Sequence, residues 1–246
     1  MKSVNISGVR GYLLLCSHMR AYTTLLGHIL GSHDQVTGYS EMHMRLRNQQ
    51  ELHRLALQVA RHSRKHYRNC YVFDNLLHDH LPITGKVLRR HDVYPLVMVR
   101  EPKATIESIL RLKARFIEEV SVAESYYIAR LERLKQTILL SEGSSLFMQG
   151  EALIERSDAV LQQLAEWLQL DTPLRGDYQR FQYTGKRKLG DSSIHIHSGR
   201  IVSERERSDQ RSPLLQAGEV SRSEDAYQQF LEFASVNVAA DKTVLA

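Results

Sequence analysis

A short apolar run ends in a turn whose residue types suit the binding of an anion. Residues 12–16 are apolar, and the turn that follows them reads Ser17, His18, Met19, Arg20, Ala21, Tyr22, Thr23 and Thr24. A turn that follows a strand and opens a helix presents backbone N–H groups and the positive end of the helix dipole to an anion. Arg20 adds a cation, and Thr23 and Thr24 add hydroxyl donors. The Walker A pattern cannot be placed on this turn, and an ordinary helix start with an exposed arginine also fits it.

The turn resembles the 5'-phosphosulfate loop of sulfotransferases that use 3'-phosphoadenosine 5'-phosphosulfate (PAPS). In that family the loop runs Lys or Arg, Ser, Gly, Thr or Ser, Thr. The matching residues here are Arg20, Ala21, Tyr22, Thr23 and Thr24. Ala21 replaces the serine and Tyr22 the glycine, and a tyrosine there either distorts a turn that needs positive φ or points toward the acceptor. The resemblance continues through residues 30–33 and 38–41, and it implies that residues 17–24 contact the donor.

A second block resembles the part of the family that binds the 3'-phosphate of the donor. Residues 94–99 are apolar, Arg100 and Pro102 follow them, and Ser108 comes eight residues after the arginine. The resemblance implies that Arg100 and Ser108 bind the 3'-phosphate. Arginine can hold a phosphate through two parallel hydrogen bonds, and Ser108 falls in the first turns of the helix after this strand.

Two further blocks complete the resemblance, which covers about residues 10–202. Residues 147–153 and 167–170 are similar to the C-terminal half of the family. Residues 184–191, followed by 198–201, resemble the loop that closes over the nucleotide, and this implies that the 3'-phosphate is contacted by Lys186, Arg187 and Lys188. A solvated basic loop is the alternative interpretation of these three residues.

The resemblance implies transfer of a sulfuryl group from PAPS to a hydroxyl or amine, with release of adenosine 3',5'-bisphosphate (PAP) and without a metal. In-line transfer needs a fixed cation for the charge that grows on the leaving phosphate, and we assign this role to Arg20. The acceptor also needs a base. Glu41 is the first candidate, because it follows the second apolar run and family members with a carboxylate base place it similarly. His43 and His78 are the alternatives.

Apolar runs and helical patterns alternate along the chain. Residues 12–16, 36–39, 70–73, 94–99 and 145–148 are expected strands, and residues 23–30, 52–59, 105–116, 121–140 and 157–168 are expected helices, with a last helix from Ser223. Alternation of this kind favours an α/β fold with a mainly parallel central sheet flanked by helices. The resemblance makes this sheet P-loop nucleotide-binding-like, the sulfotransferase fold. We expect a single domain over residues 1–246, with a core at 10–202 and a C-terminal loop and helix at 203–246.

The composition excludes fewer possible functions than the motifs do. Apolar residues make up 42% of the chain, but the longest apolar runs are far too short to cross a membrane, which favours a cytoplasmic protein. The net charge of +5 suggests an anionic partner, and residues 42–69 hold seven Lys or Arg against the single acid Glu51. We expect PAPS and an acceptor that is a small molecule, lipid or glycan as partners.

Two other functions stay open from the sequence. A P-loop kinase-like nucleotide enzyme would need Mg²⁺ ligands and a glycine-rich loop with lysine, and neither is found in place. A non-catalytic basic protein that binds a nucleotide or nucleic acid is permitted by the cluster at residues 42–69. No nucleic-acid motif accompanies that cluster, so we expect no nucleic-acid partner.

Overall fold

The fold is built on one parallel sheet. The computed structural model describes residues 8–112, 117, 119–186, 194–203, 206, 214–216 and 218–246. Its strands follow the order β2-β3-β1-β4-β5-β6, and every neighbouring pair is parallel. The strands are β1 (Gly11–Ser17), β2 (Val36–Thr37), β3 (Tyr71–Leu76), β4 (Val93–Val99), β5 (Leu146–Gln149) and β6 (Thr243–Val244). The predicted α/β class with a parallel central sheet is confirmed.

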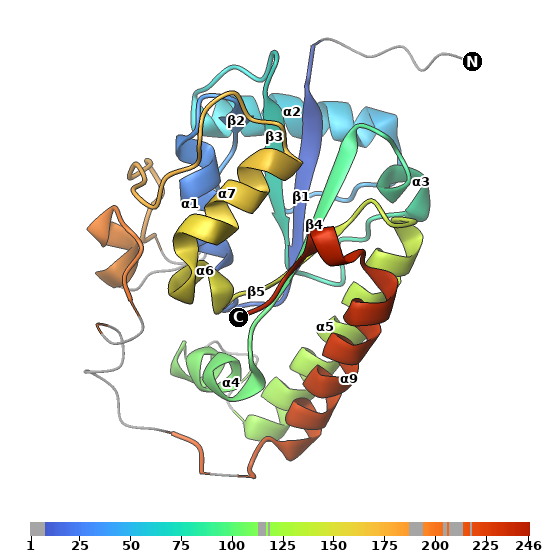
Figure 1. The fold of residues 1–246 in the computed structure, drawn as a ribbon, viewed down its shortest axis with the longest axis vertical. Helices are drawn as coiled ribbons and strands as arrows, with labels where there is room; N and C mark the ends of the chain where they lie inside the picture. Colours follow the sequence, from blue (N-terminus) through green and yellow to red (C-terminus); the bar gives the residue numbers. More distant parts are fainter. Residues whose placement is uncertain are drawn as a thin grey trace.

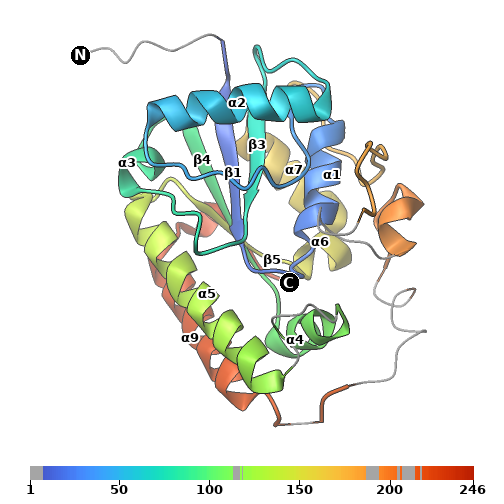
Figure 2. The ribbon, with the colours of Figure 1, turned by 180° about the vertical axis from the view of Figure 1, so that it is seen from behind.

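Helices cover both faces of the sheet (Figure 1, Figure 2). Leu13 and Leu15 of β1 pack in the same cluster as residues of α1 (Thr23–Ser32) and α7 (Ser157–Trp167). Leu14 and Cys16 pack with residues of α2 (Gln49–Ser63), α5 (Val120–Leu140) and α9 (Ser221–Asn237). A strand covered on both faces is apolar at every position, which explains the unbroken run in β1. The helices are α1 (Thr23–Ser32), α2 (Gln49–Ser63), α3 (Gly85–Leu88), α4 (Pro102–Arg111), α5 (Val120–Leu140), α6 (Ala152–Glu155), α7 (Ser157–Trp167) and α9 (Ser221–Asn237).

Several element boundaries differ from those expected. Helix α4 begins at Pro102 rather than at 105, because the Glu101 carboxylate accepts hydrogen bonds from the N–H groups of Lys103 and Ala104 and so caps the helix. Residues 113–116, the end of that expected helix, lie outside the described part. Strand β6, helices α3 and α6, and the short 3₁₀ helices Ile194–Ser198 and Ala240–Lys242 were not predicted, since each has only two to five residues and therefore no period.

The C-terminal part of the chain joins the same core. Strand β6 pairs with β5 at the edge of the sheet, and Tyr227 and Phe230 of α9 are buried in the cluster that α5 forms with the sheet. Figure 1 shows α9 lying along α5. None of the helices in the described part combines the length and apolar character that a membrane crossing requires.

Candidate functional site

The carboxyl ends of three adjacent strands meet at one edge of the sheet. Ser17 at the end of β1 pairs with Met98 near the end of β4, and Cys16 pairs with Leu76 at the end of β3. The segments that leave these strands therefore start side by side. In parallel α/β sheets this is the edge at which ligands bind.

The turn after β1 has a backbone that suits anion binding. Arg20 and Tyr22 both adopt the left-handed conformation, with φ of 67° and 63°. Turns of this kind aim backbone N–H groups into a concavity that attracts anions. Tyr22 is the N-cap of α1 but makes no side-chain cap, and the first turn of α1 has no acidic residue. The amino end of α1 is thus suited to an anion supplied by a ligand.

Tyr22 keeps the backbone conformation that a glycine would adopt there. Its φ is positive, so the turn is not distorted, although a residue with a Cβ is strained in this region. Its ring packs under the Arg100 guanidinium, 4.3 Å from the ring centroid, and close to Gly150. The tyrosine is therefore a packing partner of Arg100 and adopts the positive φ of the turn.

Arg20, Arg100 and Ser108 lie together at this edge, although they come from three segments. The Arg20 Nε donates a hydrogen bond of 2.8 Å to the Ser108 hydroxyl, and the Arg100 Nη1 donates one of 3.2 Å to the Arg20 carbonyl. All three residues are part-buried. Two guanidinium groups and a hydroxyl beside the amino end of α1 form an arrangement suited to a ligand with more than one anionic group.

Arg100 is held in place by acidic and aromatic neighbours. Its Nε lies 3.9 Å from a carboxylate oxygen of Glu151, and its carbonyl accepts a hydrogen bond of 2.6 Å from the Tyr127 hydroxyl. Burial raises the pKa of Glu151 above its ordinary value. The amino end of α4 is already capped by Glu101, so an anion at this edge would meet α1 and the two arginines rather than α4.

His18 joins the ends of β1 and β4 through a buried neutral imidazole. Its Nδ1 lies 2.8 Å from the Met19 carbonyl, and its Nε2 accepts a 2.9 Å hydrogen bond from the Arg100 N–H. One nitrogen must donate and the other accept, which only the neutral ring can do. Burial, together with the charges of Arg130 and Arg100, lowers the pKa of His18 to about 3. The predicted loop residue is therefore a structural link between the turn and Arg100.

This burial predicts an acid-sensitive fold. Between about pH 6.5 and pH 3 the unfolded chain binds a proton at His18 that the folded chain does not, so the folded state loses up to about 1.4 kcal/mol of stability per pH unit as the pH falls. His18→Gln keeps an acceptor for the Arg100 N–H but cannot titrate. Urea unfolding across this range should show a shallower pH dependence for the variant.

The exposed His91 offers a matched control for the same measurement, since His91→Gln should leave the pH dependence of the wild-type chain unchanged. Parallel stability curves for the wild-type chain and His18→Gln would contradict the assignment of a buried neutral imidazole.

The three candidate bases form a second cluster at this edge. Glu41 and His43 follow β2, and His78 follows β3, the neighbouring strand. A Glu41 carboxylate oxygen lies 3.6 Å from the His43 Nδ1 and 3.4 Å from the His78 Nε2. The Glu41 side chain is 15% exposed, against 30% for His78 and 47% for His43. The carboxylate is thus the most enclosed of the three.

Two neighbours tie this cluster to the rest of the edge. The buried Asp74 of β3 accepts a 2.8 Å hydrogen bond from the Met42 N–H and so fixes the segment that carries Glu41. Burial raises the pKa of Asp74 well above its usual range. The Tyr126 hydroxyl accepts a 2.9 Å hydrogen bond from the Met19 N–H, and burial, with smaller contributions from the charges of Asp79 and Glu41, raises its pKa to about 12. Tyr126 therefore lies within electrostatic range of Glu41 and in contact with the turn.

A buried arginine connects the ends of β1 and β3. Arg130 of α5 donates to the Ser17 carbonyl and, over 3.0 Å, to the Leu76 carbonyl, and it also pairs with Asp79. Its side chain is 4% exposed. These contacts hold the turn and the segment with His78 in a fixed relation.

The closing loop is described only in part. Arg187 and Lys188 lie outside the described residues. Lys186 is exposed, and its ammonium lies over the Tyr183 ring at 4.8 Å. The segment is held by Thr184, which bonds the His28 ring on α1, and by stacking of Phe181 on Tyr39 and of Tyr183 on His62.

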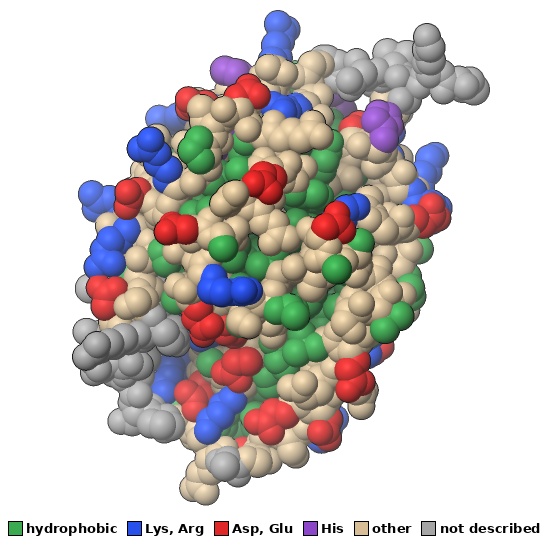
Figure 3. Space-filling model, viewed as in Figure 1, with side chains coloured by type: hydrophobic (Ala, Val, Ile, Leu, Met, Phe, Trp, Pro, Cys, Tyr) green, Lys and Arg blue, Asp and Glu red, His purple; other side chains and the backbone are tan. Residues whose placement is uncertain are grey.

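The basic segment is partly occupied by internal contacts. Arg47 forms a 2.6 Å ion pair with Glu51, and the Lys65 ammonium donates to the carbonyls of His33 and Val36. Helix α2 lies across the face seen in Figure 2. On the opposite face, Figure 3 shows acidic and basic side chains interspersed rather than a continuous basic surface.

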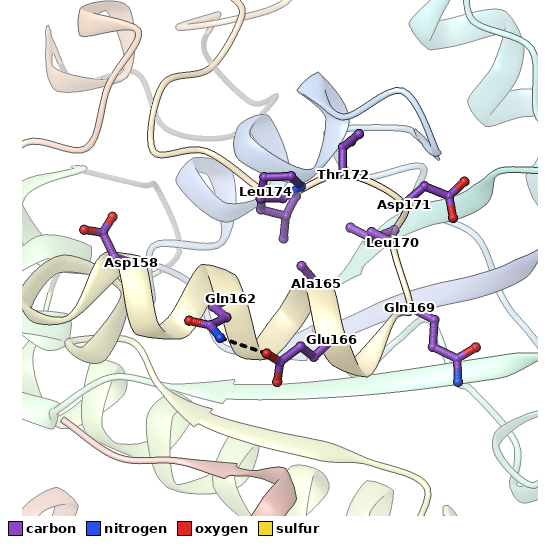
Figure 4. A pocket seen from close by; sticks show the side chains of 10 residues that line it. Asp158, Gln162, Ala165, Glu166, Gln169, Leu170, Asp171, Thr172 and Leu174 are labelled. Carbon is purple, nitrogen blue, oxygen red and sulfur yellow. Dashed lines mark hydrogen bonds between the residues drawn. The ribbon is translucent and has the colours of Figure 1, made fainter.

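A shallow hollow lies at the other end of the sheet. It is lined by α7 and the turn at residues 169–174, and Figure 4 shows Asp158, Glu166 and Asp171 around it. Arg10, just before β1, pairs with Asp171 and bonds the Gln169 carbonyl, which places the hollow near the amino ends of the strands. Its acidic lining and its position make it unsuitable for an anionic donor.

Known structures share this architecture. The structure matches the "Sulfotransferase Domain from the Curacin Biosynthetic Pathway" with a TM-score of 0.63 and 16% identity, over 90% of this chain and 99% of that one. The chain has a sulfotransferase fold. It also matches the "Sulfotransferase Domain from the Synechococcus PCC 7002 Olefin Synthase", with a TM-score of 0.60 and 16% identity, over 91% and 96% of the two chains. No family model and no curated protein sequence matches the chain.

Within this sulfotransferase fold, several residues of the candidate site were not predicted. Arg130, Tyr126 and Tyr127 lie on α5, and the sequence showed only the helical period of that segment. Asp74 lies in β3 but one residue beyond the strand expected at 70–73, so nothing in the sequence indicated that this carboxylic acid is buried and needs a specific partner.

Proposed function

We propose that this protein is a PAPS-dependent sulfotransferase that moves the sulfuryl group of PAPS to a hydroxyl or amine of an acceptor. The observation that carries the proposal is the meeting of Arg20, Arg100 and Ser108 beside the amino end of α1. PAPS has anionic groups at both its 5' and 3' positions, and this arrangement offers cations for both. The sulfotransferase fold supports the same conclusion.

The donor would lie along the carboxyl ends of β1 and β4. The left-handed turn and the end of α1 would hold the 5'-phosphosulfate, with Arg20 close to the oxygen that links sulfur to phosphate. Arg100 and Ser108 would hold the 3'-phosphate. Lys186, Arg187 and Lys188 stay candidates for closing over it, although Lys186 lies on Tyr183 in this structure.

The reaction is an in-line displacement at sulfur. The acceptor oxygen or nitrogen attacks sulfur, the bond from sulfur to the phosphate oxygen of the donor breaks, and PAP leaves with the bonding electrons. The negative charge that grows on that phosphate is stabilised by Arg20. Glu41 accepts the proton of the acceptor, since its carboxylate is the most enclosed group of the three candidates and the histidines on either side hold it in place.

Donor binding tests the proposal first. PAP should bind the full chain without Mg²⁺, and ATP with Mg²⁺ should not compete well. The Arg100→Ala variant should bind PAP about ten-fold to a hundred-fold more weakly, because a charge-assisted hydrogen bond contributes about 1.5–3 kcal/mol. Arg89→Ala is a matched control, since Arg89 is a surface residue that pairs with Glu142.

An assay of sulfuryl transfer is the second test of the proposed function. Incubation with labelled PAPS and pooled hydroxyl and amine acceptors should label at least one acceptor class. A strict need for ATP and Mg²⁺ would favour a kinase instead. A steep loss of DNA or RNA affinity with salt, without PAP binding, would favour a basic binding protein.

A further inference from the structure

Three side chains with metal-binding atoms converge beside the proposed base. A carboxylate oxygen of Glu41 and one ring nitrogen each of His43 and His78 all lie within 4.8 Å of one another. Two of the separations are 3.4 Å and 3.6 Å. In the part of the chain that the structure describes, this is the one group of three such residues that comes together.

These separations suit a tetrahedral transition metal. Zn²⁺ bound by nitrogen and oxygen at about 2.0–2.1 Å places neighbouring ligand atoms about 3.4 Å apart. The two distances from Glu41 are already close to that value. His43 is the most exposed of the three, so its ring is the least constrained by its neighbours.

The backbone prepares the ligands in this arrangement. Glu41 and His43 flank Met42, whose N–H is fixed by the Asp74 carboxylate at 2.8 Å. His43 adopts a left-handed conformation, with φ of 51°, which is uncommon for a residue other than glycine. The His43 and His78 rings stack with their centroids 5.6 Å apart. A strained residue that aims a ring nitrogen at a neighbouring carboxylate is a pattern found at functional sites.

The donor set also selects the kind of ion. Imidazole nitrogen suits zinc, iron, nickel and copper, whereas Mg²⁺ and Ca²⁺ prefer oxygen ligands alone. Three protein ligands leave one position of a tetrahedral ion open to water or another ligand.

We propose that Glu41, His43 and His78 form a binding site for a divalent transition-metal ion, with Zn²⁺ as the best match. The resemblance to the family implied no metal, and the sequence offered these three residues only as alternative bases. If the proposed function holds, the ion also inhibits transfer, since it occupies the carboxylate that accepts the proton of the acceptor.

Zinc titration of the full chain, stripped of metal with EDTA, tests the site directly. One equivalent of Zn²⁺ should bind in calorimetry, and Co²⁺ should give the visible absorption of a tetrahedral complex. The His78→Ala and His43→Ala variants should each bind more than about 100-fold more weakly, because even the loss of an outer partner of a ligand costs 10–100-fold. His80→Ala is the matched control, since its ring packs on His78 at 5.4 Å but is not a ligand.

Unchanged zinc affinity in both His78→Ala and His43→Ala would overturn the proposed metal site, because the ion would then bind elsewhere in the chain. Recovery of binding in His78→Cys would support it, since a thiolate can replace the imidazole. Thermal unfolding and PAP binding of each variant separate a lost ligand from a lost fold.

The expected inhibition of transfer rests on the proposed function, so its result is interpreted separately from the zinc titration. Zn²⁺ should inhibit transfer and EDTA should restore it. A chain that binds one zinc through these ligands but transfers no sulfuryl group even after EDTA has removed the metal would contradict the proposed function and leave the metal site supported.

Discussion

The Arg20→Ala variant is expected to lose transfer activity by a factor of at least about 10²–10³ in kcat, the usual cost of removing one group that stabilises charge in a transition state. The guanidinium is oriented by its hydrogen bond to Ser108 and by the left-handed backbone at its own position. Its removal should therefore act on the chemical step. The wild-type chain and Arg20→Ala are compared by their initial rates with labelled PAPS and the acceptor found in the pooled assay.

Two controls separate the loss of this cation from a loss of structure. Arg89→Ala should keep full activity, because Arg89 is exposed and pairs with Glu142 on the surface. Arg20→Ala should keep the thermal stability of the wild-type chain, since its side chain is part-buried and lies outside the core clusters. Retention of most activity in a folded Arg20→Ala protein would refute the role of Arg20.

The Glu41→Gln variant is expected to lower kcat by about 10²–10⁴-fold, the range that a general base contributes. Glutamine keeps the shape of the side chain but cannot accept the proton, so the folded structure and PAP binding should be unaffected. The assay is run with EDTA present, so that a bound metal does not contribute. Glu142→Gln, on the surface, is the matched control.

Near-normal turnover of Glu41→Gln would remove Glu41 as the base. The same assay on His43→Ala and His78→Ala would then distinguish the two alternatives, since loss of the true base lowers kcat more than loss of a neighbour that only orients it.

Much of the architecture was predictable because it depends on long buried segments. The runs at residues 12–16 and 94–99 are apolar at every position, as strands covered on both faces must be. Strand β6 has two residues, and nothing in its composition shows that it pairs with β5. Its place depends on α9 returning the chain to the sheet, which is a tertiary effect.

The residues of the candidate site that follow the ends of strands were predictable from the sequence. Arg20, Glu41, His78 and Arg100 all follow strands, so the parallel sheet alone brings them to one edge. The contact between Arg20 and Ser108, and the place of Tyr22 beneath Arg100, depend on side-chain directions that spacing does not give. The role of His18 was missed because a histidine in a loop sequence carries no sign that its ring is buried.

Arg130 has a consequence for how substrate geometry is maintained. This one side chain donates to carbonyls at the ends of β1 and β3, the strands that lead into the turn with Arg20 and the segment with His78. Under the proposed function these segments bind the donor and face the acceptor, so the distance between sulfur and the proposed base would depend on a guanidinium that touches neither reactant. Under the proposed function, a substitution of Arg130 would misalign donor and acceptor and so lower turnover, while each substrate still binds.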